Sequence, residues 1–415
     1  MDTSRRLTRR GLLAAGGVAI LGAASGCTPS GQPEVDDTTT APPPSPSPTQ
    51  ATGAVQPAAQ ELVYPFYGEH QSGVETPQTT LQTFIGLDLI DPSPETADAV
   101  LRLVSDDAAR LTQGLPALGD TEPAIAASPA GLTITVGLGR QLFEKTGQVD
   151  DIPAALVEIP AFATDALEEP WGQTDLMIQI ASNDAVTLNH ATRMVTKDLS
   201  TLTKVKWMQD GFLPNEPAVP GGIGRRNLMG QVDGTVNPTP GTPDFATVVW
   251  DDSVGPAWVT GGTVLVLRRI RMLLDAWEKL DPETQENVIG RHQDTGAPLG
   301  GSSELEPFDY EAVDENGLPV IPEDSHIRVS RATSIEGMIL RRPYSYNAGM
   351  HDGTNDMGLL FAAYMRDPAT SFIPMQERVA QLDAFNEWNT TIGSAAYFLP
   401  AGAREGGYIG EGIFA

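Results

Sequence analysis

The chain has 415 residues, a formal net charge of −28 at pH 7 and a single cysteine. The strongly acidic balance argues against a nucleic-acid partner, because proteins neutralise nucleic-acid phosphates with lysine and arginine. One cysteine excludes an intramolecular disulfide, so the fold has to depend on core packing.

The first 27 residues have the pattern of an export signal. Two arginine pairs, the second at Arg9-Arg10, precede a short apolar stretch at 11–24. Both pairs resemble a twin-arginine signal, which directs the export of folded proteins. The sequence AASGC resembles a lipobox that ends at Cys27. We therefore expect an extracellular or cell-envelope protein that touches a membrane only through a lipid anchor at Cys27.

A change of composition then separates the signal from the globular part. Residues 28–60 are rich in proline, threonine and serine and contain almost nothing to bury, which predicts a disordered linker. The remaining residues are enough for two domains. We place these at 61–225 and 226–415.

Hydrophobic periodicity predicts a β-α-β-β-α-β order in the first domain. The expected strands are 81–89, 132–138, 175–182 and 204–212, and the expected helices are 94–115 and 184–199. The residues expected to face the core from the first helix are Ala99, Leu101, Leu103, Val104 and Leu111.

The second domain repeats this order. Its expected strands are 262–270, 337–346, 358–365 and 395–400, and its expected helices are 273–289 and 372–388. Two such units indicate an α+β fold with two ferredoxin-like domains, whose antiparallel sheets are covered by helices. A long insert at 291–335 follows the first of these helices. Inserts of this length in compact domains are usually functional or disordered.

The sequence GGIGRR lies between the two domains, at 221–226. It is similar to a phosphate-binding loop, but it lacks the Lys-Ser/Thr pair that a nucleotide loop needs. We interpret it as a flexible inter-domain connection.

The stretch MGQVDGTVNP, at 229–238, places Asp233 close to two glycines. Asp-Gly and Asn-Pro are common turn signals, so one interpretation is that Asp233 bonds only its own backbone. The other is that Gly230 and Gly234 allow the backbone and the carboxylate to approach a bulky ligand closely.

His326 is one of five histidines and lies in the insert, in the sequence PEDSHIRVSRAT. A lone histidine is commonly a surface or structural residue, and no His-Glu-x-x-His or Cys-x-x-Cys pattern supports a zinc site. A haem iron makes a smaller demand, since the porphyrin supplies four nitrogens and the protein one imidazole.

Five motifs in order carry a family resemblance. They are PFYGEHQSGVETP (65–77), GQVDGT (230–235), SHIRVS (325–330), ILRRPYSY (339–346) and DMGLLFAAYMRDP (356–368). Together they resemble dye-decolorizing (DyP-type) peroxidases, most closely the exported deferrochelatase-like branch. The resemblance implies a DyP-type dimeric α+β barrel architecture and one haem b per chain. It also implies oxidation of dyes, phenols or other small-molecule or surface-oxidised reductants by hydrogen peroxide, and it is compatible with a homo-oligomer.

The resemblance also implies roles for individual residues. Asp233 matches the distal aspartate, Arg341 the distal arginine with Arg342 as the alternative, and His326 the proximal iron ligand. Peroxide has to lose a proton from one oxygen and gain one on the other, so the reaction needs a base that becomes an acid. A permanently cationic arginine can stabilise the charge that develops as the O–O bond breaks.

Further matches surround this set. Asp383 is the best match to the carboxylate that bonds the proximal imidazole, and Glu387 is the second. The residues that match positions in contact with the haem or its propionates are Gly234, Thr235, Val236 and Arg331.

Two other functions remain open from the sequence. A deferrochelatase or haem-handling lipoprotein would bind haem with little peroxidase turnover. A lipid-anchored solute-binding protein would bind no haem, and the absence of a Soret band would identify it.

Overall fold

The computed structural model describes residues 62–253, 255–351 and 353–414. The predicted export signal, the lipidation of Cys27 and the predicted linker lie outside these residues. Within the described part of the chain, no helix is both long enough and apolar enough to cross a membrane.

The N-terminal half has the predicted β-α-β-β-α-β order. Its strands are β1 (Leu81–Leu89), β2 (Thr133–Gly139), β3 (Leu176–Ser182) and β4 (Thr203–Phe212). The two main helices are α1 (Pro94–Leu111) and α4 (Ala185–Leu199), and the shorter elements are α2 (Pro123–Ala126), α3 (Arg140–Thr146), η2 (Val149–Asp151) and η3 (Glu169–Trp171).

The core-facing side of α1 differs from the prediction at two positions. Leu101, Val104 and Leu111 are buried as expected, but Leu103 is 41% exposed and Ala99 is only partly buried. The buried stripe follows the three- and four-residue spacing of one helix face, which Leu103 does not share.

The C-terminal half repeats the order with more interruptions. Its barrel strands are β7 (Thr263–Met272), β9 (Tyr344–His351), β10 (Thr354–Met365) and β11 (Asn389–Leu399). Its helical elements are α5 (Pro243–Val249), α6 (Leu274–Trp277), α7 (Pro282–Ile289), α8 (His326–Val329), α9 (Phe372–Leu382) and η4 (Ala384–Trp388). Three two-residue strands complete it: β5 (Arg225–Arg226), β6 (Val232–Asp233) and β8 (Leu340–Arg341).

Three predicted elements of this half are broken, each for a local reason. The expected helix at 273–289 is two helices, because Asp281 caps a new helix that begins at Pro282. The expected strand at 337–346 is split into β8 and β9, and the break contains Pro343, which has no N–H to donate. The expected helix at 372–388 ends at Leu382, and Asp383 caps the 3₁₀ helix that follows.

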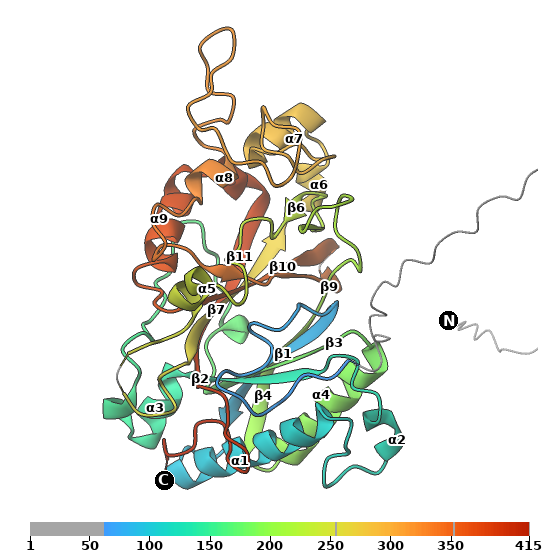
Figure 1. Ribbon diagram of the computed structural model, residues 1–415, viewed down its shortest axis with the longest axis vertical. Helices are drawn as coiled ribbons and strands as arrows, with labels where there is room; N and C mark the ends of the chain where they lie inside the picture. The colour runs from blue at the N-terminus through green and yellow to red at the C-terminus, as the bar shows by residue number, and fades with distance from the viewer. Residues whose placement is uncertain (1–61, 254, 352, 415) are drawn as a thin grey trace, which may run out of the picture. The chain divides into compact units, whose positions relative to one another are not determined.

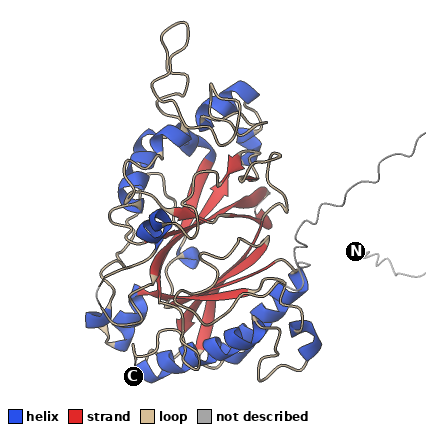
Figure 2. Cartoon of the chain, in the orientation of Figure 1, coloured by secondary structure: helices blue, strands red, loops and turns tan. Residues whose placement is uncertain are grey.

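The eight long strands form one closed antiparallel barrel (Figures 1 and 2). The order is β7-β11-β2-β3-β1-β4-β9-β10, and pairing of β10 with β7 closes it. Each half contributes a ferredoxin-like sheet, and the sheets join where β11 pairs with β2 and β4 with β9. The predicted α+β fold with two ferredoxin-like units is therefore confirmed.

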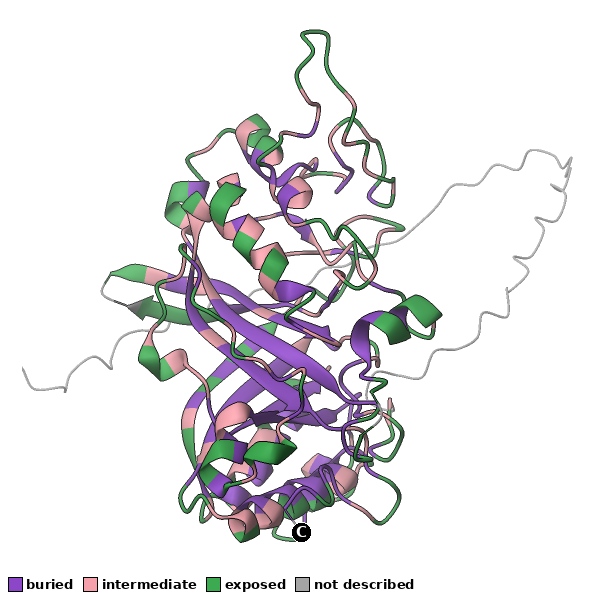
Figure 3. Cartoon of the chain, turned by 90° about the vertical axis from the view of Figure 1, so that its left-hand side faces the viewer, coloured by how far each residue is buried: buried purple, intermediate pink, exposed green. Residues whose placement is uncertain are grey.

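Helices cover the barrel from outside, and most of the length of its strands is buried (Figure 3). Helices α1 and α4 pack on the N-terminal sheet. Phe372 of α9 and Trp277 of α6 belong to clusters on the C-terminal sheet. The insert at 291–335 contains one short helix, α8, and projects beyond α7 in Figure 1.

Candidate active site

Asp233 faces an arginine that lies far away in sequence. It ends β6, which pairs with β5 in a two-stranded ribbon. Its Oδ1 accepts a hydrogen bond from the backbone N–H of Gly234 (2.7 Å) and one from Nη1 of Arg341 (3.1 Å). Gly234 has a φ of 87°, and a Cβ built there would meet no atom within 4 Å. Asp233 is thus both a turn residue and one member of an ion pair beside open space.

Asn237, expected from the sequence only as part of a turn signal, fixes the backbone of Arg341. Its Oδ1 accepts from the backbone N–H of Arg341 (2.8 Å), and its Nδ2 donates to the backbone oxygen of the same residue (2.8 Å). The pair of bonds ties the loop after β6 to β8. No spacing rule could indicate this contact, since the two residues lie more than a hundred positions apart.

The ion pair lines a cavity of ≈ 160 Å³ on the outside of the barrel. Asp233, Gly234, Asn237 and Arg341 contribute to its wall, together with Leu359 of β10. The side chains of Asp233 and Arg341 are 19% and 25% exposed, so both reach the cavity while most of their surface is covered.

His326 begins α8 in the insert and is held by a buried carboxylate. Its Nδ1 lies 2.6 Å from Oδ2 of Asp383, whose side chain is only 1% exposed. Oδ1 of Asp383 accepts the backbone N–H of Phe385 at 2.9 Å, which fixes the carboxylate. The break between α9 and η4 therefore places Asp383 against the imidazole.

The environment of His326 connects it to the Asp233–Arg341 pair. Burial lowers the pKa of His326, but the charge and hydrogen bond of Asp383 outweigh burial and raise the pKa above its ordinary value. The charges of Arg341 and Asp233 also act on this pKa.

The donor set fits a haem iron better than a metal ion held by protein alone. Nδ1 of His326 is occupied by Asp383, while its other ring nitrogen has no hydrogen-bond partner within the described residues. The described residues also contain no group of three or more His, Cys, Asp or Glu side chains suited to a metal ion. One free imidazole nitrogen is what a porphyrin iron requires.

Glu387 and Arg342, the alternatives to Asp383 and Arg341, do not make the corresponding contacts. Glu387 is exposed, whereas Asp383 is buried against the imidazole. The charge of Arg342 acts on the buried tyrosines Tyr344 and Tyr364, and Arg341 makes the ion pair with Asp233.

The remaining predicted haem contacts are spread over two loops. Val236 is 47% exposed and Arg331 is exposed, with its guanidinium 4.7 Å from the ring of Tyr310. Thr235 donates its hydroxyl hydrogen to Glu304 (2.8 Å). Glu304 is a buried residue of the insert, and no local sequence pattern marks it as part of the site.

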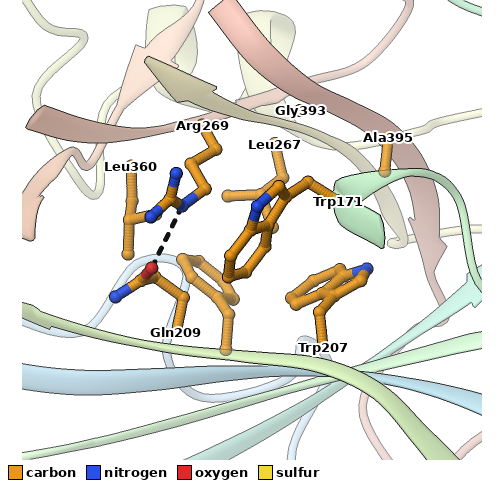
Figure 4. Close-up of a pocket in the computed structure, with 9 residues that line it drawn as sticks. Trp171, Trp207, Gln209, Leu267, Arg269, Leu360, Gly393 and Ala395 are labelled. Carbon is orange, nitrogen blue, oxygen red and sulfur yellow. Dashed lines mark hydrogen bonds between the residues drawn. The ribbon is translucent and has the colours of Figure 1, made fainter. Parts of the chain in front are cut away.

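A second cavity lies inside the barrel (Figure 4). Its volume is only ≈ 20 Å³, enough for about one water molecule. The guanidinium of Arg269 lies 4.1 Å from the rings of Trp171 and Tyr346, donates to Gln209 (3.0 Å) and pairs with Asp356 (2.9 Å). These side chains fill the barrel interior and leave no room for a ligand, so their contacts are structural.

Comparisons with known proteins agree with this geometry. The sequence profiles "Dyp-type peroxidase, N-terminal" and "Dyp-type peroxidase, C-terminal" match residues 71–213 and 224–404. A dye-decolorizing peroxidase of Thermobifida fusca is 39% identical over 83% of this chain and 83% of its own length. A deferrochelatase of Escherichia coli is 33% identical over 88% of this chain and 90% of its own length. The crystal structure of a DyP-type peroxidase from Cellulomonas bogoriensis is 40% identical and superposes with a TM-score of 0.82, covering 86% of this chain and 99% of that one.

Proposed function

The chain belongs to the Dyp-type peroxidase family, and we propose that Asp233, Arg341 and His326 carry the chemistry of its haem site. It is a haem-dependent peroxidase that uses hydrogen peroxide to oxidise a reductant. The observation that supports this assignment of residues is the Asp233–Arg341 ion pair in the wall of a cavity, together with a buried carboxylate that holds the imidazole of His326 through Nδ1 and leaves its other nitrogen free.

The residues have distinct tasks in this proposal. Haem, when bound, would supply a ferric iron as the redox centre for the reduction of peroxide. The carboxylate of Asp233 takes the proton from one peroxide oxygen and returns it to the other. The guanidinium of Arg341 remains cationic and stabilises the negative charge that develops on oxygen. Asn237 orients Arg341 through its backbone.

The free ring nitrogen of His326 would hold the haem iron. The hydrogen bond from its Nδ1–H to Asp383 orients the ring and makes it a stronger electron donor. A more electron-donating imidazole would favour the ferric state of a bound haem iron.

The test compares Asp233→Asn with Arg341→Leu in rapid mixing with peroxide. Acid–base groups contribute about 10²–10⁴-fold, so Asp233→Asn should slow the haem spectral change by a factor in that range while leaving haem occupancy intact. A large loss only in Arg341→Leu would reduce Asp233 to an orienting role. Unchanged rates in both variants would overturn the assignment of this pair.

We further propose export by the twin-arginine route, with lipidation at Cys27 holding the protein at the cell envelope. The support is the sequence alone: the arginine pairs before the apolar stretch and the lipobox-like AASGC. Cell fractionation of Cys27→Ala tests the anchor, because this variant should leave the membrane fraction. Continued sedimentation with membranes would contradict it.

Deferrochelatase activity is a second candidate, favoured by the relative of that name. It would release iron and leave the porphyrin intact. Fluorescence of metal-free porphyrin after incubation of the haem-loaded protein with a reductant would detect this activity. Its absence would leave peroxidase as the only activity of the site.

A further inference from the structure

The GGIGRR segment binds a side-chain carboxylate of the same chain, that of Glu304. Oε1 of Glu304 accepts the backbone N–H groups of Gly224 (2.8 Å) and Ile223 (3.3 Å). A Cβ at Gly222 would lie 2.0 Å from Oε2 of Glu304, and one at Gly224 would lie 2.9 Å from Oε1. The glycines are therefore needed for the carboxylate to approach the backbone. The similarity to a phosphate loop has this physical basis, and the segment is not a flexible connection.

Glu304 is buried without a direct counter-ion. The residue is 3% exposed, and within the described part of the chain its Oε2 is buried with no hydrogen-bond partner. Arg291 is close, but its Nη1 donates to the backbone oxygen of Glu304 (3.2 Å) and not to the carboxylate. The charge of Glu304 still acts on Arg291, but a buried oxygen without a partner is costly, so the contacts of this carboxylate indicate a task at the site.

The third hydrogen-bond donor to the Glu304 carboxylate is a neighbour of Asp233 in the sequence. Oγ1 of Thr235 donates to Oε1 of Glu304 at 2.8 Å, and Thr235 is two residues after Asp233. The ribbon of β5 and β6 joins the same two segments, since Arg225 pairs with Asp233. Glu304 thus holds both sides of the ribbon, at 223–224 and at Thr235, directly behind the aspartate.

We propose that Glu304 is a positioning residue for Asp233. By tying Thr235 to the GGIGRR segment, it fixes the turn at Gly234 and so sets the Asp233 carboxylate opposite Arg341. The insert at 291–335 then contributes two residues, since it supplies His326, which contacts Asp383, and Glu304, which accepts from Thr235. This inference rests on the acid–base role proposed for Asp233.

The test uses the haem-loaded protein and three single variants. Glu304→Ala removes the acceptor, Thr235→Val removes only the hydroxyl donor, and Glu311→Gln is the matched control, an exposed carboxylate of the same insert. Displacement of a catalytic group by about 1 Å can cost roughly 10²-fold. We expect Glu304→Ala to slow the reaction with peroxide by about 10–100-fold and Thr235→Val to slow it in the same direction. Glu311→Gln should react like the unaltered protein.

Cyanide association provides a readout besides activity. Hydrogen cyanide has to give up its proton as cyanide binds ferric haem, so a displaced Asp233 should slow this association as well. Glu304→Gln keeps an oxygen acceptor and should recover most of the rate lost in Glu304→Ala. The Soret spectrum and haem occupancy of each variant show whether the pocket itself is retained. If Glu304→Ala loses haem, Thr235→Val decides the question.

A double-mutant cycle separates this proposal from the proposed function. If Glu304 acts through Asp233, then Asp233→Asn combined with Glu304→Ala should lose no more rate than Asp233→Asn alone. Additive losses, or a normal rate in Glu304→Ala and Thr235→Val beside a slow Asp233→Asn, would overturn the positioning role alone. A normal rate in Asp233→Asn would overturn the acid–base role and this inference with it.

Discussion

Asp233 has a local and a long-range contact, and only the first is readable from its neighbours. The Asp-Gly pattern correctly indicated a bond to the adjacent backbone, which the N–H of Gly234 supplies. The ion pair with Arg341 depends on how β6 and β8 are brought together, and a turn signal contains no such information. The family resemblance supplied the candidates at this scale, and in the structure Arg341 is the one that makes an ion pair with Asp233.

Asp383 provides the first prediction at the residue scale. Asp383→Asn removes the charge that its 2.6 Å contact with Nδ1 of His326 brings to the imidazole. Loss of such a partner typically costs about 10–100-fold in metal affinity or activity. We expect weaker haem retention and a higher Fe(III)/Fe(II) midpoint potential, measured by competition for haem and by spectroelectrochemistry.

The matched control for this variant is Glu387→Gln, which changes an exposed carboxylate in the following 3₁₀ helix. It should leave both quantities unchanged. Equal effects of the two variants would remove Asp383 from its proposed role.

At the scale of elements, hydrophobic periodicity was a good guide to strands and a poorer guide to helix ends. Six of the eight barrel strands lie within four residues of their predicted bounds, because alternating or continuous apolar runs are local signals. The exceptions are β9, and β11, which begins six residues before its predicted start. The breaks at Asp281-Pro282 and at Asp383 were missed, since each is a capping event inside an otherwise helical pattern. The second of these breaks presents the carboxylate to His326.

A buried carboxyl on α1 gives an element-scale prediction. Asp107 is 4% exposed, and its Oδ2 has no hydrogen-bond partner in the described part of the chain. Burial, with the charges of Asp198 and Asp106 adding to it, raises the pKa of Asp107 to about 7. The folded protein therefore binds this proton more tightly than the unfolded chain, and the free energy of unfolding should fall as pH rises from about 4 to 7.

Asp107→Asn should remove this dependence. At pH 8 the variant should be more stable than the unaltered protein by on the order of 1–3 kcal/mol, and near pH 4 the two should be equal. Denaturant unfolding at a series of pH values measures the difference. A constant difference across this range would show that the side chain acts through packing and not through its charge.

At the scale of the whole molecule, the barrel makes the two halves interdependent. Local patterns predicted two ferredoxin-like units but could not predict the pairings β11–β2 and β4–β9 that merge their sheets, because these depend on contacts distant in sequence. The barrel interior adds a charged cluster across the halves. Arg269 of β7 bonds Asp356 of β10 and Gln209 of β4, and it lies between the rings of Trp171 and Tyr346.

This cluster yields the last prediction, which concerns the stability of the whole barrel. Asp356 pairs with both Arg269 and Arg271, and the Arg269 side chain is only 4% exposed. Asp356→Asn would leave a buried guanidinium without its counter-charge, so we expect a loss on the order of 3 kcal/mol in the free energy of unfolding. Asp106→Asn, which breaks an exposed ion pair with Arg110 on α1, should cost less than about 1 kcal/mol. Because one barrel contains both halves, loss of the Soret band and loss of amide protection in α1 should shift together in Asp356→Asn. A shift of the haem signal alone would mean that the N-terminal sheet unfolds independently, and that the shared barrel does not couple the two halves.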